Sequence, residues 1–94
     1  MSNVWHRYPE DSLLVEPLGD ATAVYCLHTG DTHLIDAFPL AILDALRDEG
    51  PLPAGKVSQL LAELLDETPE AVEPRVRAVL ASLELMQLVE CTDA

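Results

Sequence analysis

Basic residues are scarce in this 94-residue chain, in which five Lys and Arg stand against 17 Asp and Glu, a formal net charge of −12. Such an acidic surface repels polyanions, so nucleic acid is a poor candidate for the principal partner. Aromatic residues are also few, at 4%, whereas apolar residues make up 49%. We therefore expect one domain with a core of aliphatic side chains, because the chain is too short to bury two cores.

Long apolar runs and a cysteine framework are equally lacking. The N-terminus has no basic segment followed by an apolar stretch, and no run approaches the roughly 18 apolar residues that a membrane span requires. We therefore expect a soluble, cytoplasmic protein with no membrane partner. The two cysteines, Cys26 and Cys91, are expected as thiols in a reducing compartment, although they could pair with each other in a secreted chain.

The sequence also lacks the motifs that many enzymes use. Its four glycines are isolated turn residues, so there is no phosphate-binding loop, and its serines lie in no nucleophile elbow. Acidic pairs such as Asp48-Glu49 are typical of solvated helix ends. We predict that the protein is not an enzyme and that it has neither catalytic residues nor a cofactor.

Three short strand-forming segments are present near the start of the chain, at residues 13–18, 23–28 and 32–35. Turn signals at Gly19-Asp20 and Thr29-Gly30-Asp31 separate them, which predicts a three-stranded antiparallel meander.

The flanks of the meander carry weaker signals. Pro17 lacks an N–H group, which favours an edge position for the first strand or ends that strand. Residues 1–12 are polar around a lone Trp5 and predict a partly loose N-terminal arm, followed by a single domain over residues 13–91. Residues 88–91 are strand-like but short.

Helical periodicity replaces the strand pattern after Asp36, a capping residue. It predicts a helix over about residues 37–48 and a second short helix around residues 57–65. A third helix begins after the capping residue Thr68, and Pro74 is expected to kink that helix or delay its start. The predicted fold class is α+β, a meander followed by three helices, similar to a winged helix-turn-helix.

Cys26, His28 and His33 form a small cluster around the second turn, and these residue types are common zinc ligands. Their spacing matches no usual zinc pattern, and a fourth ligand would have to come from Cys91 or an acidic residue. The simpler interpretation is a buried cysteine and two histidines that cap an exposed hairpin. We therefore predict no metal site.

The helical part also raises the alternative of a winged-helix regulatory protein that binds DNA or a protein partner. A DNA-recognition helix needs basic and amide side chains near its N-terminus. The third predicted helix carries Glu70 and Glu73 there, with Arg75 and Arg77 as its only cations. Repulsion from phosphate argues against DNA.

The remaining candidate is the last strand of the meander, Thr32, His33, Leu34 and Ile35, which has an open edge unless another segment covers it. An extended peptide can bind such an edge as an additional strand. Val76 and Val79 of the third helix could line a groove beside it. The alternative is that this helix face is buried in the core.

The run VYCLHTGDTHLIDAFPLAIL, a tryptophan near the start and LVE after the last helix resemble the PqqD-like peptide chaperones over about residues 5–90. They are most similar to the subgroup encoded beside an HPr-kinase-like protein. Many relatives have asparagine where this chain has Asp36, and either residue can cap a helix.

The resemblance implies a winged helix-turn-helix fold that recognises the leader segment of a ribosomally made precursor peptide. The leader is expected to lie along residues 32–35 and the third helix, and to be handed to a peptide-modifying enzyme or an HPr-kinase-like protein. The implied binding residues on that helix are Arg75, Val76, Val79, Leu80 and Leu83.

Overall fold

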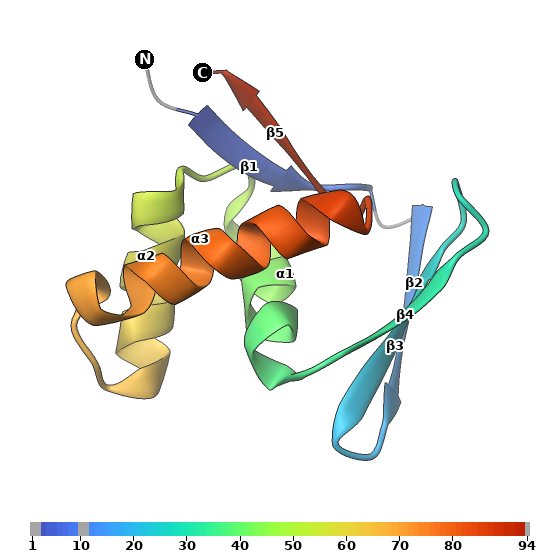
Figure 1. Ribbon diagram of the computed structural model, residues 1–94, viewed down its shortest axis with the longest axis horizontal. Helices are drawn as coiled ribbons and strands as arrows, with labels where there is room; N and C mark the ends of the chain where they lie inside the picture. The colour runs from blue at the N-terminus through green and yellow to red at the C-terminus, as the bar shows by residue number, and fades with distance from the viewer. Residues whose placement is uncertain (1–2, 10–11, 94) are drawn as a thin grey trace.

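The structure, a computed structural model, describes residues 3–9 and 12–93 (Figure 1). Eight elements follow in the order β1 Asn3–Arg7, β2 Leu13–Leu18, β3 Ala21–Cys26, β4 Thr32–Ile35, α1 Ala37–Glu49, α2 Ala54–Leu65, α3 Pro69–Leu85 and β5 Val89–Asp93. The fold is α+β, with an antiparallel meander followed by three helices in a winged-helix-like arrangement, which confirms the predicted class.

The meander has the strand order β2-β3-β4. Gly19 and Gly30 both have positive φ, 66° and 82°, as the predicted turns require. β3 begins and ends two residues before the predicted 23–28 segment. It ends at Cys26 because the carbonyl of Cys26 accepts hydrogen bonds from Thr29 and Gly30, which closes the turn early.

Part of the predicted N-terminal arm forms a strand, so the arm is not loose over these residues. Residues 3–7 form β1, which pairs antiparallel with β5 from Asn3 opposite Asp93 to Arg7 opposite Val89. Trp5 also exchanges two backbone hydrogen bonds with Leu52, of 2.7 and 2.9 Å. These contacts join the two ends of the described chain into a ribbon. The rest of the predicted arm includes residues 1–2 and 10–11, which lie outside the described residues.

The helix termini follow the predictions in part. Thr68 caps α3, since its side-chain oxygen accepts a hydrogen bond from the N–H of Ala71. Asp36 occupies the cap position of α1 but makes no side-chain capping bond. α3 begins directly at Pro69 and contains Pro74, so Pro74 does not delay its start.

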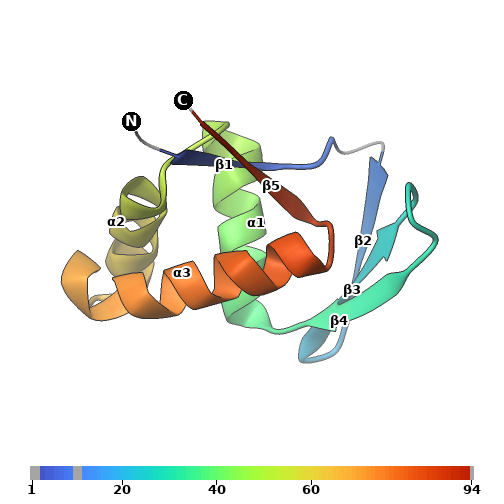
Figure 2. The ribbon, with the colours of Figure 1, turned by 45° about the horizontal axis from the view of Figure 1, so that its top comes forward.

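The helices enclose the core, and the two sheets flank them. In Figures 1 and 2, α3 crosses α1 and α2, the meander lies beside one end of this group, and the β1–β5 ribbon lies across another. The largest fully buried side chains are aliphatic: Ile42, Leu43, Leu61, Leu80, Leu83 and Leu88. None of the helices in the described part of the chain has the length and apolar character of a membrane-spanning segment.

Candidate functional site

The edge of β4 that faces away from β3 is unpaired in the meander. Two hydrogen bonds show which backbone groups of β3 face β4 and which face β2. Cys26 N–H donates to the Asp31 carbonyl, and Leu27 N–H donates to the Ser12 carbonyl, both at 2.8 Å. Antiparallel pairs alternate between bonded and non-bonded residues. It follows that His33 and Ile35 bond to β3, whereas the N–H and C=O groups of Thr32 and Leu34 face outward.

The side chains of β4 alternate across the sheet. Ile35 is only 4% exposed and belongs to the core, whereas Leu34 on the opposite face is 66% exposed. Thr32 is exposed and His33 is half-buried. The strand is therefore anchored from one face, and its outer face and outer edge remain accessible.

The third helix contributes less to a surface site than the sequence suggested. Val76 and Leu80 are 0% exposed and Leu83 is 1% exposed, so these three side chains cannot line a groove open to a peptide. They pack in the core because they lie on the inner face of α3 at helical spacing. Val79 is half-buried, and of the predicted helix residues only Val79 and Arg75 remain near the surface.

Arg75 lies over the ring of Phe38, with its guanidinium carbon 4.0 Å from the ring centroid. This cation–π contact joins α3 to the first turn of α1, which directly follows β4. Both side chains line a cavity of about 330 Å³, whose other lining residues are Ala37, Ala41, Leu61, Leu64 and Leu65. An apolar pocket with one cation therefore lies just beyond the end of β4.

Sequence reasoning missed Phe38 and this cavity. Phe38 is the single phenylalanine of the chain and stands beside Pro39 at the start of a helix. Its position after an open-edged strand was the one available signal. The contribution of α2 could not be read from local sequence, because the cavity forms only when α1, α2 and α3 pack together.

Cys26 and His28 contact the residues that directly follow α3. Cys26 Sγ lies 3.7 and 3.6 Å from the carbonyl oxygens of Met86 and Gln87, and His28 Nε2 lies 3.1 Å from the Gln87 carbonyl. The His28 ring also stacks on Tyr8 at 4.5 Å. Carbonyl groups at a helix C-terminus lack partners within the helix, so these contacts satisfy them.

Among the side chains that the structure describes, no three His, Cys, Asp or Glu residues are grouped so as to hold a metal ion. Cys26 and Cys91 are free thiols. Nε2 of His33 is buried and has no hydrogen-bond partner in the part of the chain that the structure describes.

The cations of α3 are engaged within the protein. Arg77 Nε binds Glu73 at 2.9 Å, and Arg75 is stacked on Phe38. With a chain charge of −12, this surface offers little to the phosphates of a nucleic acid.

No protein-family model matches the chain, and no curated protein matches it. Among solved structures, the fold is similar to that of TbiB1 in complex with the TbiA(beta) leader peptide. The TM-score is 0.71 over 90% of this chain and 94% of that chain, at 19% sequence identity. At this level of identity, the similarity establishes a shared fold.

Proposed function

We propose that this protein is a non-catalytic, PqqD-like adaptor that captures the leader segment of a ribosomally made precursor peptide. The open edge of β4 carries the proposal, because the outward N–H and C=O groups of Thr32 and Leu34 offer two donors and two acceptors to an added strand. The fold that it shares with a leader-peptide complex supports the same reading.

The side chains around this edge indicate what the peptide presents. Leu34 offers an exposed apolar contact beside the edge. A peptide that continues past Ile35 reaches the cavity at Phe38 and Arg75, which suits an apolar side chain. The acidic surface favours a precursor with basic residues outside this contact.

The same proposal assigns the partners. The captured peptide is presented to a peptide-modifying enzyme or to an HPr-kinase-like protein, in the cytoplasm. The similarity of TGDTHLID to the HPr-kinase-associated subgroup supports the second partner.

The experiment is an NMR titration of the labelled protein with a precursor peptide encoded near its gene, repeated with Leu34→Pro. Because the N–H of Leu34 points away from β3, proline removes an edge donor but no bond of the β3 ladder. The sheet already accepts proline at such a position, since Pro17 of β2 also faces outward. We expect shifts at residues 32–35 and around Arg75 in the natural protein.

In Leu34→Pro, we expect binding to weaken by about tenfold or more, because a backbone hydrogen bond is lost and the ring obstructs the edge. Val15→Pro is the control, with the same change at an outward position of the opposite edge strand. It should leave the affinity unchanged. Because Val15 is half-buried against the core whereas Leu34 is exposed, circular dichroism is also used to check the fold of this variant. Unchanged affinity in a folded Leu34→Pro variant, with circular dichroism as the check, would rule out strand addition at β4.

A further inference from the structure

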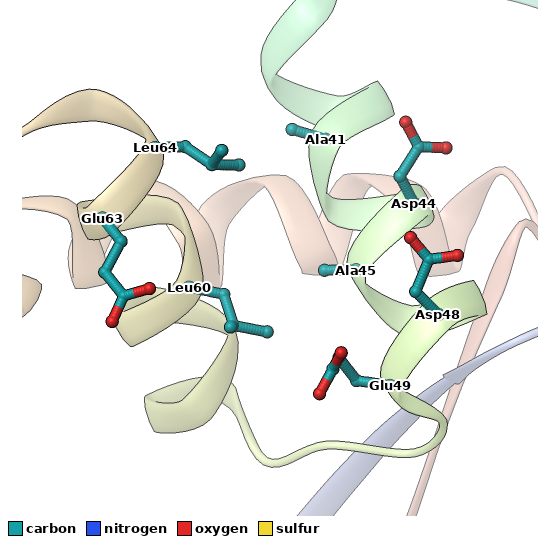
Figure 3. Close-up of a pocket in the computed structure, with 8 residues that line it drawn as sticks. All are labelled: Ala41, Asp44, Ala45, Asp48, Glu49, Leu60, Glu63 and Leu64. Atoms are coloured by element: carbon teal, nitrogen blue, oxygen red, sulfur yellow. The ribbon is translucent and has the colours of Figure 1, made fainter.

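A second concave surface lies between α1 and α2. It has no lining residue on β4, and it adjoins the cavity at Phe38, with which it shares Ala41 and Leu64. Figure 3 shows Leu60 and Leu64 pointing from α2 toward Ala41 and Ala45 of α1, with α3 passing behind both helices. The cavity has a volume of about 370 Å³. We call it the α1–α2 groove; its lining residues are Ala41, Asp44, Ala45, Asp48, Glu49, Leu60, Glu63 and Leu64.

The floor of the α1–α2 groove is apolar and incompletely covered. Leu64 is 72% exposed, and Ala41, Ala45 and Leu60 are half-buried. The two alanines leave room for the side chains of another segment to approach the backbone of α1. Burial of such exposed apolar surface by a partner is favourable.

The rim of the groove is acidic. Arg47 binds both Asp44, at 3.3 Å, and Asp48, at 3.0 Å, so it offsets part of their charge. Glu49 and Glu63 have no ion-pair partner within residues 3–9 and 12–93. Lys56 lines an adjoining cavity together with Glu49 and Glu63 and donates to Gln59 at 3.5 Å.

This combination of apolar floor and acidic rim selects among occupants by charge. A second copy of the chain would bring like carboxylates together, and each copy has a net charge of −12. An anionic lipid surface is repelled for the same reason. A segment with apolar side chains flanked by Lys or Arg complements both features.

We propose that the α1–α2 groove binds a cationic amphipathic helix of a partner protein, whose apolar face lies over Leu60 and Leu64. The mode is a helix in a groove, with apolar anchors at helical spacing. Identification of the partner with the modifying enzyme rests on the function proposed above, whereas the preference of the groove for a cationic helix does not. In that case, the β4 edge and the docking groove use different residues, and the cavity at Phe38 shares only Ala41 and Leu64 with the groove.

The test is a titration of labelled protein with a synthetic helix of about 14 residues that carries leucines on one face and lysines beside them. A second peptide has glutamate in place of every lysine. We expect shifts at residues 41–49 and 60–64 with the lysine peptide alone. Raising NaCl from about 50 to about 500 mM should weaken its binding about tenfold, because the rim charges are screened.

Two pairs of variants distinguish binding in the groove from nonspecific attraction to the acidic surface. Leu64→Ser and Glu63→Lys should each weaken binding about fivefold or more, by loss of apolar contact and reversal of a rim charge. Leu85→Ser and Glu84→Lys are the matched controls: Leu85 is 86% exposed, Glu84 is exposed, and both are on α3 outside the groove. The controls should bind normally.

Equal losses in variants and controls, or shifts spread over acidic residues outside the groove, would overturn the proposal in favour of nonspecific attraction. Self-association that Leu64→Ser abolishes would overturn it in favour of a dimer. Glu63→Lys, Leu85→Ser and Glu84→Lys should still bind the precursor peptide, because none of these residues lies on β4 or lines the cavity at Phe38. Failure of the groove is therefore distinguishable from failure of the adaptor function.

Discussion

The two sheets of this protein differ in how their edges are closed. In the β1–β5 ribbon, the free side of β1 is bonded at Trp5 to the backbone of Leu52. In the meander, β2 carries Pro17 at an outward position, whereas β4 presents its outer edge without a proline or a paired strand. Proteins usually cover or blunt their strand edges. We propose that the open edge of β4 is the place where a further strand adds.

The largest expected effect on stability distinguishes the inward-facing Ile35 of β4 from the outward-facing Leu34. Ile35→Pro removes an N–H that bonds to β3 and a side chain that is 4% exposed, so we expect it to lower the free energy of unfolding by about 3 kcal/mol or more. Leu34→Pro should cost about 1 kcal/mol. Urea denaturation measures both changes. Equal losses of stability would show that the N–H group of Leu34 bonds to β3 and does not face outward.

A smaller effect is expected in the other sheet. Trp5→Ala removes a half-buried ring that packs against the core, so stability should fall by about 2 kcal/mol, less than for a fully buried tryptophan. Because β1 does not pair with the meander, the affinity for a precursor peptide should be unchanged once the protein is folded. A loss of affinity in the folded variant would show that the two sheets are coupled.

The smallest effect concerns the turn that leads into β4. Gly30 has a φ of 82°, which is unfavourable for alanine although nothing lies within 4 Å of the added methyl group. Gly30→Ala should therefore destabilise the protein by about 1 kcal/mol. Gly55→Ala is the control, since Gly55 lies in α2 with open space around it and no positive φ. It should be neutral or slightly stabilising in thermal unfolding.

These contrasts also explain what the sequence could predict. The meander was predictable because Gly19-Asp20 and the turn at Gly30 are local signals that join neighbouring segments. The pairing of Asn3 with Asp93 could not be predicted, because no local sequence signal specifies which residues pair when two strands lie at opposite ends of the chain.

The candidate site was also predictable only in part. The edge of β4 followed from strand order, whereas the inner face of α3 was misjudged at Val76, Leu80 and Leu83. An apolar stripe at helical spacing has the same appearance whether it faces the core or a ligand groove. Its burial depends on how α1 and α2 pack against it.

The pairing of β1 with β5 has a topological consequence. Asn3 lies opposite Asp93, and both figures of the whole chain show the two ends side by side. A short linker can therefore join the two ends in a circular permutation. The new chain termini can then be placed elsewhere, for instance in the loop at Gly50 and Pro51 between α1 and α2. By the same geometry, the whole domain can be spliced into a surface loop of a larger protein without separating its strands.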